Sequence, residues 1–419
     1  MAQDTASRDG MLKQIKDAIS EGYESYDAAY KAAAEGAGAG VPDMMHFLAE
    51  CYLYGIGTEI SNREGCKWLK KAAEAGSFSA QFNLASMYLD GGYLQRNPEE
   101  AFKWFSRSVS GGDPAAEYAL AQCYDNGIGC RQDTALALEW YTKSAEQGFP
   151  GAEYELGQMY FSGRGVEKDQ ERAVELYRHA AENGHDEAQN EMGYCLSTGQ
   201  GIVQDYDEAF KWYEKSAGQG NAVAMYCLAT CYGSGYGTEK DPVKSFEYSK
   251  KSADLGYVPS QYRTGVCLMA GNGCKADEKE AFNYFKASAN EGFPPGEDAL
   301  AMCYMSGTGV QKNEPLAFKW FEKAAKAGIP NAMAELGFYY MQGRVTPRNP
   351  EEGVKLFRQA ARMGDPSGQY YMGLCYETGD GVDQDLNTAL QFYLQAAGQG
   401  HEEALERARD VQYVIDDNE

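Results

Sequence analysis

Basic residues and histidines are scarce in this sequence. Of 419 residues, 38 are Lys or Arg against 62 Asp or Glu, which gives a formal charge of -24, and only 4 are His. A surface that binds nucleic acid needs a basic face to neutralise phosphates, and so does one that binds an anionic membrane. The charge therefore argues against both kinds of partner.

Long apolar runs are also missing. No apolar stretch of roughly 7–15 residues follows a basic segment near the start, and nowhere do about 18 apolar residues run together. The sequence thus predicts no secretory signal and no membrane insertion, and we expect a cytoplasmic protein.

Motifs that carry chemistry are lacking too. The chain contains no phosphate-binding GxxxxGK[ST], no HExxH, no GxSxG and no EF-hand loop. Its four histidines, at positions 46, 179, 185 and 401, do not form a set that recurs through the repeats. We therefore expect no catalytic residue, no metal site and no cofactor.

Glycine, by contrast, is abundant and periodic. Of the 48 glycines, two sets of ten recur with a spacing of 36 residues, one running from Gly55 to Gly379 and the other from Gly76 to Gly400. Between them lie segments whose apolar residues recur every three or four positions, which is helical periodicity. Ten helix pairs are predicted, without an insertion.

Residues that favour helix termini explain where these helices begin and end. The first helix of each pair stops at a glycine suited to the left-handed conformation. The second helix is preceded by a residue whose side chain can accept amides of the first turn, worth about 1 kcal/mol each. These caps are Ser61, Asn97, Asp133, Asp169, Asp205, Asp241, Asp277, Asn313, Asn349 and Asp385.

Aromatic residues share fixed slots within the repeat. Tyrosine recurs in one slot of the first helix, and all five tryptophans occupy one slot of the second. We interpret both sets as core. They are Tyr52, Tyr88, Tyr124, Tyr160, Tyr232, Tyr304, Tyr340 and Tyr376, with Trp68, Trp104, Trp140, Trp212 and Trp320.

The repeat resembles the Sel1-like repeats, relatives of the tetratricopeptide repeats. Residues 151–185 carry almost the whole A…LG..Y..G.GV..D...A...Y..AAE.G pattern, and the resemblance covers about residues 41–401. It implies a right-handed α-solenoid superhelix of ten 36-residue helix-turn-helix units. Cysteines that pair in disulfide-rich relatives are absent from the matching slots, which hold alanines such as Ala73 and Ala145, so a reducing compartment is favoured.

The ends of the chain differ from the repeat. Residues 1–40 read as an N-terminal helical cap, with two helices over 8–36 out of phase with the repeat, and a Gly-rich connector. Residues 402–419 read as a C-terminal capping helix and an acidic tail. Polar caps of this kind keep a stack of identical units soluble.

If the array coils as its relatives do, the first helices line a concave groove. A leucine such as Leu84 or Leu120 recurs in the first helices, and the slots two residues before it and two and five after it then face the groove. These slots are rich in aromatic residues and methionine, which suit an adaptable binding surface. The same residues would also serve to pack neighbouring first helices together, so both interpretations stay open. The candidates are Phe82, Tyr118, Tyr154, Tyr226, Tyr262, Met269, Met302, Met305, Phe338, Met341 and Tyr370.

Charge adds a preference for the partner. Residues 1–210 carry 34 acidic and 17 basic residues, and residues 211–419 carry 28 and 21. The acidic half would attract a basic segment, although acidity also simply keeps a solenoid soluble. The family resemblance implies an adaptor that binds a protein or peptide. The alternative that it raises is an enzyme or ligand-binding protein of the β-lactam-binding type, which requires a reactive serine in a cleft.

Overall fold

The computed structural model describes residues 26–418, and its regular structure in that range is entirely helical. The helix expected within residues 8–25 lies outside this range. The chain divides into two units, residues 1–205 and 206–419. Unit 1 contains α2 (Tyr26–Gly38), α3 (Pro42–Tyr54), α4 (Asn62–Glu74), α5 (Phe78–Asp90), α6 (Pro98–Ser108), the 3-10 turn η1 (Val109–Gly111), α7 (Pro114–Asn126), α8 (Thr134–Glu146), α9 (Pro150–Ser162), α10 (Gln170–Glu182) and α11 (Asp186–Thr198).

Unit 2 continues the same pattern of helices. It contains α12 (Tyr206–Gly218), α13 (Ala222–Ser234), α14 (Pro242–Asp254), α15 (Val258–Ala270), α16 (Glu278–Asn290), α17 (Pro294–Ser306), α18 (Glu314–Lys326), α19 (Pro330–Gln342), α20 (Pro350–Arg362), α21 (Pro366–Thr378), α22 (Leu386–Ala397) and α23 (Glu402–Asn418). The odd-numbered helices α3 to α21 are the first helices of the repeats, and the even-numbered helices α4 to α22 are the second helices.

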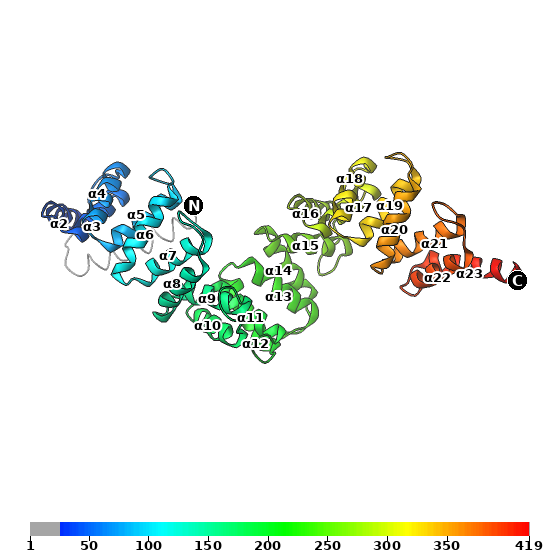
Figure 1. Cartoon of the computed structure of the whole chain (residues 1–419), viewed down its shortest axis with the longest axis horizontal. Coiled ribbons are helices and arrows are strands. Elements are labelled where there is room, and N and C mark those ends of the chain that lie inside the picture. Colours follow the sequence, from blue (N-terminus) through cyan, green and yellow to red (C-terminus); the bar gives the residue numbers. More distant parts are fainter. Residues whose placement is uncertain (1–25, 419) are drawn as a thin grey trace. The chain divides into compact units, whose positions relative to one another are not determined.

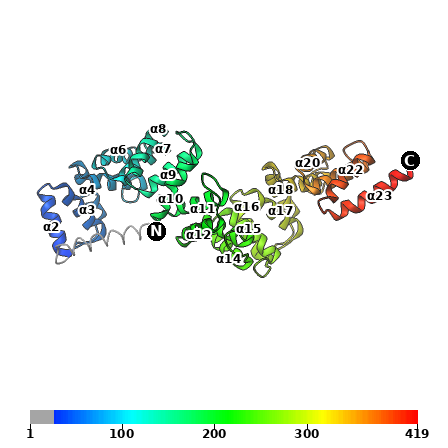
Figure 2. The same ribbon diagram turned by 90° about the horizontal axis from the view of Figure 1, so that it is seen from below.

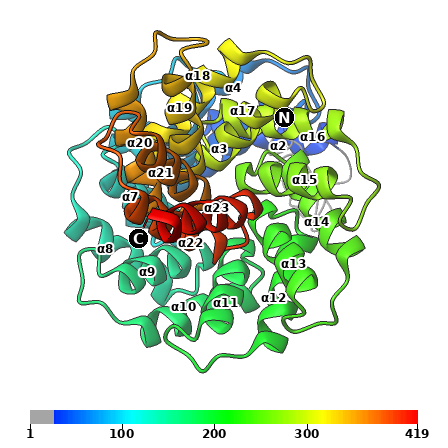
Figure 3. The same cartoon turned by 90° about the vertical axis from the view of Figure 1, so that its right-hand side faces the viewer.

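Within each unit, helices that follow one another in the sequence pack side by side (Figure 1). In unit 1, α7 and α9 lie on the inner side of an arc and α8 and α10 on its outer side (Figure 3). In unit 2, α15 and α17 lie inside and α16 and α18 outside. The predicted all-helical solenoid of ten repeats is confirmed, and the first helices present the inner face of each arc.

The predicted helix boundaries are confirmed by their hydrogen bonds. Gly127 ends α7 with a φ of 66°, and its N–H donates to the carbonyl of Cys123. Asp169 caps α10 by accepting the amide of Arg172 at 2.9 Å. Equivalent caps form at eight further predicted positions, which are Ser61, Asn97, Asp133, Asp241, Asp277, Asn313, Asn349 and Asp385.

A second glycine, present in eight of the ten loops, allows one repeat to dock on the previous one. Gly129 has a φ of 67°, and a Cβ built there would lie 2.0 Å from the carbonyl oxygen of Pro98, at the start of α6. Gly57 stands in the same relation to Tyr26 at the start of α2, with a distance of 2.3 Å. These loops therefore touch the backbone of the preceding second helix.

The N-terminal helix is in phase with the repeat, contrary to expectation. The first residue of α2, Tyr26, lies 36 positions before the first residue of α4, Asn62. Tyr30 of α2 packs edge-on against Tyr52 with ring centroids 5.8 Å apart, as Phe102 packs against Tyr124 two repeats later. Thus α2 takes the position of a second helix, while α23 follows α22 in the position of a first helix (Figure 2).

The interpretation of the tyrosine and tryptophan slots as core was too strong. Only Tyr232 of the eight tyrosines, and Trp104 and Trp212 of the five tryptophans, are buried, and the others are half-buried. Lys143 lies over the ring of Trp140 at 3.9 Å from its centroid, where solvent-facing aromatic surface remains. The true aromatic core is a different slot of the second helices, one that follows the tryptophan by one residue. It holds Phe105, Tyr141, Tyr177, Tyr213, Phe285, Phe321, Phe357 and Tyr393, all buried.

Cysteine contributes to the core as a small apolar residue. Seven cysteines share one slot of the first helices and are buried thiols without a disulfide. Burial raises the pKa of Cys123, for example, to about 12, so its thiol stays protonated and unreactive. The seven are Cys51, Cys123, Cys195, Cys231, Cys267, Cys303 and Cys375. No helix within residues 26–418 has the length and apolar character needed to span a membrane.

Candidate functional site

Three predicted residues lie on the inner face of unit 1, each on a different first helix. Phe82 of α5, Tyr118 of α7 and Tyr154 of α9 are all half-buried. Each ring rests on a buried aromatic residue of its own repeat, as in the pair of Tyr154 and Tyr177 with centroids 6.1 Å apart. Tyr118 also packs against Phe149 at 5.1 Å, and Tyr154 stacks on His185 at 4.9 Å, so only part of each ring remains accessible.

An apolar pocket opens between α5 and α7. It has a volume of about 350 Å³. Phe82 and Tyr118 form two of its walls, so the structure brings these predicted residues together. Phe149, directly before α9, forms a third wall, and its ring centroid lies 5.1 Å from that of Tyr118. The full lining is Phe82, Ser86, Leu89, Asp90, Phe105, Ala115, Tyr118, Ala119, Gln122, Cys123, Ile128 and Phe149.

The tyrosine hydroxyls are held at the edge of this face by glutamines one turn later. Gln122 donates to the Tyr118 hydroxyl at 2.8 Å, and Gln158 donates to the Tyr154 hydroxyl at 3.2 Å. Burial, with the nearby charge of Glu155, raises the pKa of Tyr118 to about 12. Both hydroxyls therefore remain protonated at neutral pH, and each keeps a proton that it can donate.

Carboxylates lie beside these rings. Glu155 of α9 and Glu191 of α11 are half-buried, and burial raises the pKa of each side chain. Their charges raise the pKa of the Tyr154 hydroxyl between them, after the larger effect of burial. The inner face of unit 1 thus combines aromatic rings with poorly solvated acidic groups, a combination that attracts cations.

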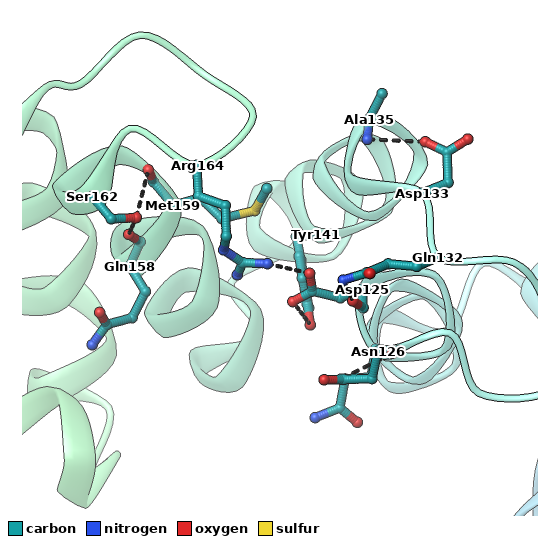
Figure 4. A network of polar contacts seen from close by, with 11 residues as sticks. Asp125, Asn126, Gln132, Asp133, Ala135, Tyr141, Gln158, Met159, Ser162 and Arg164 are labelled. Carbon is teal, nitrogen blue, oxygen red and sulfur yellow. Dashed lines mark hydrogen bonds and ion pairs between the residues drawn. The ribbon is translucent and has the colours of Figure 1, made fainter.

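One acidic group of this unit is neutralised within the chain. Asp125, at the end of α7, forms an ion pair with Arg164 from the loop after α9, and accepts a hydrogen bond from Tyr141 at 3.5 Å (Figure 4). Gln132 donates to the Asp125 backbone carbonyl at 2.7 Å. Two successive repeats are therefore joined by an arginine that lies beside a buried tyrosine.

In unit 2 the predicted tyrosines occupy the same slot and make the same kind of contact. Tyr262 packs against Phe285 and Phe293, with centroids 6.0 and 5.8 Å away. Tyr226 packs against Tyr257 at 5.5 Å, and Tyr370 stacks on His401 at 4.5 Å. Packing between neighbouring helices therefore accounts for part of their surface.

The predicted methionines and Phe338 fall into two groups. Met269 and Met302 are each 37% exposed on the inner helices α15 and α17. By contrast, Met305 packs against the core cluster around Phe321, and Met341 and Phe338 pack against the cluster around Phe357. Only the first pair presents substantial apolar surface.

A second acidic group lies on unit 2. Asp298 of α17 accepts two hydrogen bonds from Asn331 of α19, at 3.0 and 3.1 Å. Burial, followed by the charges of Asp298 and Asp365, raises the pKa of Glu335 to about 7. These carboxylates are half-buried, as in unit 1.

Sequence reasoning overlooked the residues that give the inner face its polarity. Glu155, Glu191 and Glu335 all occupy the position directly after the predicted aromatic slot, a register that the 36-residue period made readable. Phe149 was hidden because its position, just before the first helix, reads as a loop. Among residues 26–418, no group of three or more His, Cys, Asp or Glu side chains is arranged to hold a metal ion.

Comparison with known families accounts for this architecture. Ten consecutive segments match the Sel1 repeat: residues 42–77, 78–113, 114–149, 150–185, 186–221, 222–257, 258–293, 294–329, 330–365 and 366–401. The chain belongs to the Sel1 repeat family. Sel1 repeat proteins generally act as protein-interaction scaffolds, and the repeat is typically a non-enzymatic fold.

Two solved Sel1 repeat structures are similar over most of the chain. One is c5321, a protective antigen of uropathogenic Escherichia coli with an SLR fold, at 30% identity and a TM-score of 0.77, covering 92% of this chain and 82% of the other. The second is a Sel1 repeat protein from Oxalobacter formigenes, at 27% identity and a TM-score of 0.55, covering 73% of this chain and 88% of the other. No protein with a curated function matches the chain significantly.

Proposed function

We propose that the protein is a non-enzymatic adaptor that binds a segment of a protein partner on the inner face of unit 1. The observation that carries this proposal is the apolar pocket between Phe82 and Tyr118, which opens on a face bearing the carboxylates of Glu155 and Glu191. The pocket has room for one large apolar side chain, whose complete burial is worth about 1.5–3 kcal/mol.

The chemistry of this face supports a partner segment that is both apolar and basic. A segment with an apolar anchor would fill the pocket, and basic residues beside the anchor would meet the acidic side chains along α9 and α11. The net charge of -24 accelerates the approach of such a segment. A stacked array of helices suits this task, because its first helices offer successive, equally spaced contacts to an extended chain.

The enzyme alternative finds no support at this pocket. Ser86 is the serine among its lining residues, and its hydroxyl donates to the backbone carbonyl of Phe82 at 3.1 Å. No histidine or lysine lines the pocket to take the proton that a nucleophilic serine must lose. We therefore assign the pocket to binding.

Replacing both Tyr118 and Tyr154 with alanine is expected to reduce capture of the partner from native lysate by about 30-fold. This corresponds to a combined loss of about 2 kcal/mol of binding free energy, as expected when interface hot spots are removed. Capture is quantified by mass spectrometry of affinity-purified material. The matched control is Trp140→Ala, which removes a half-buried aromatic ring from the outer helix α8.

Helical circular dichroism should be unchanged in both proteins. Undiminished capture by the double variant, or equal losses in the double variant and the control, would contradict binding at the inner face.

A further inference from the structure

A pair of tyrosines occupies the aromatic slots of three repeats, with different polar surroundings in each. Repeat 10 has Tyr370 and Tyr393 with ring centroids 5.8 Å apart, and the pairs Tyr118–Tyr141 and Tyr154–Tyr177 lie at 5.9 and 6.1 Å. In each pair, the first tyrosine belongs to a first helix and is half-buried, whereas the second belongs to the following helix and is buried.

In repeat 10 an arginine completes this arrangement. The Tyr393 hydroxyl donates to a carboxylate oxygen of Glu377, and Arg407 of α23 binds the other oxygen at 3.2 Å. The charge of Glu377, and to a smaller extent Tyr393 and Tyr370, raises the pKa of Arg407. Carboxylate, guanidinium and tyrosine hydroxyls therefore satisfy one another.

Repeat 3 has an arginine in the same chemical role. Asp125 takes the position of Glu377, the Tyr141 hydroxyl donates to it, and Arg164 pairs with it (Figure 4). This arginine comes from a loop, so the chain supplies a guanidinium to the same place from a different element. The role recurs although the position in the sequence does not.

Repeat 4 has the tyrosines without the arginine. Counting back 216 residues, Tyr154 and Tyr177 match the tyrosines of repeat 10, Phe161 matches the acid, and Glu191 stands at the position of Arg407. The carboxylate thus comes from the next first helix, α11. Burial raises the pKa of Glu191, and a hydrogen bond from Asn190 lowers it. Among the described residues, no basic side chain contributes to this shift.

Two buried polar groups next to this carboxylate also lack a hydrogen-bonding partner. Tyr177 is 0% exposed, and its hydroxyl makes no hydrogen bond within the described residues. Asn190 is 8% exposed, and its Oδ1 accepts none. Asn190 hydrogen-bonds the Glu191 carboxylate. The charge of that carboxylate raises the pKa of Tyr177, after the larger effect of burial, so both groups lie near Glu191. Unsatisfied buried polar groups are rare and costly, so this site is incomplete as it stands.

We propose that the site between α9 and α11, formed by Tyr154, Tyr177, Asn190 and Glu191, receives an arginine side chain of the protein partner. The planar guanidinium carries five N–H donors, enough for the Glu191 carboxylate, the Asn190 carbonyl and the Tyr177 hydroxyl oxygen. The Tyr154 ring already stacks on His185, with centroids 4.9 Å apart, and lies against Tyr177, so the guanidinium meets the edge of this ring and not its face. Tyr154 and Glu191 are half-buried and form the accessible rim of the site, whereas the Tyr177 hydroxyl and the Asn190 Oδ1 are covered and lie at its base.

This assignment rests on the proposed function and gives the partner a specific residue. Arginine is favoured over lysine because three acceptors at different positions match a fork of donors better than a single ammonium. The chain itself uses arginine each time: a third example is Arg263, which donates to Thr230, to the Ala229 carbonyl and to Ser245 while lying 5.6 Å from the Tyr226 ring centroid.

The test uses the full-length protein and three mixtures of fluorescein-labelled heptapeptides. The central residue is fixed as arginine, lysine or citrulline, and the other positions vary among Ala, Leu, Gly and Ser. Fluorescence anisotropy should show the arginine mixture binding about tenfold more tightly than the other two, as expected for one charge-assisted set of hydrogen bonds. Glu191→Gln should bring the three mixtures to within about twofold, because it removes the charge with little change in shape.

Two further variants make the result specific. Tyr177→Phe should reduce the arginine preference by about threefold, since one hydrogen bond is lost. Glu182→Gln removes the same charge from an exposed position on the outer helix α10 and should leave the preference unchanged. Equal binding of arginine and citrulline mixtures to the unmodified protein, or a full preference in Glu191→Gln, would overturn the arginine site.

The outcome also separates this inference from the proposed function. If the mixtures bind without preference and Tyr118→Ala still weakens them, the inner face binds peptides but the arginine site is wrong. If no mixture binds at all, the arginine site is again wrong, whereas capture of the native partner continues to decide the function.

Discussion

Replacing Gly129 with alanine will lower the free energy of unfolding by about 3 kcal/mol or more. A methyl group there meets the Pro98 carbonyl oxygen at 2.0 Å, and the residue must keep a φ of 67°. The left-handed conformation costs about 1–2 kcal/mol for an L-residue, and overpacking adds about 1–3 kcal/mol. Because the atoms that the methyl group meets belong to the backbone of Pro98 and Glu99, no side chain can move aside to relieve the clash.

Urea denaturation followed by circular dichroism measures this loss. The control is Gly184→Ala, which keeps the left-handed conformation at φ 90° but adds a methyl group with no atom within 4 Å. That variant should lose only about 1–2 kcal/mol. Equal losses in the two variants would show that the loop does not hold consecutive repeats together.

The second large effect concerns two tyrosines at the same position of different repeats. Tyr393→Phe will destabilise the protein by about 1.5–3 kcal/mol, since its hydroxyl donates to the Glu377 carboxylate and hydrogen bonds to charged groups are worth that much. Tyr177→Phe will leave stability unchanged or raise it by about 1 kcal/mol, because it removes a buried hydroxyl that has no partner.

Thermal and urea denaturation of both variants test this difference in sign. The two changes remove the same atom from positions that are both 0% exposed, so each serves as the control for the other. A loss in Tyr177→Phe as large as that in Tyr393→Phe would mean that the Tyr177 hydroxyl is already satisfied, which would also weaken the case for an incoming arginine.

The fold was predictable because its determinants are local. Caps such as Asp169 and terminating glycines such as Gly127 act within a few residues, so a spacing of 36 residues read from the sequence translates directly into helix ends. Ser25 and Gly40 lie 36 residues before Ser61 and Gly76, but the phase of α2 was missed because Ile19 stands where the other glycine of the repeat would precede them. The position of α2 becomes evident only from the contacts of Tyr26 and Tyr30 with the first repeat.

The candidate site was predictable only in part. The slot that holds Tyr118 and Tyr154 was identified, but its rings had to be seen against Phe149 and Tyr177 before their buried and open sides could be distinguished. Burial at the tryptophan slot was overestimated, since recurrence of a large residue shows that it packs but not how completely it is covered. The acceptor group around Glu191 depends on three helices, and no single helix reveals it.

Site-specific photocrosslinking tests the central claim most directly. A benzoylphenylalanine at position 122, beside the pocket between α5 and α7, is compared with one at position 139, exposed on the outer helix α8, in the same native lysate. Binding on the inner face predicts a discrete partner adduct from position 122 that disappears in the Tyr118→Ala, Tyr154→Ala background, and none from position 139. The same adduct formed mainly from position 139, or from position 122 regardless of the tyrosines, would contradict it.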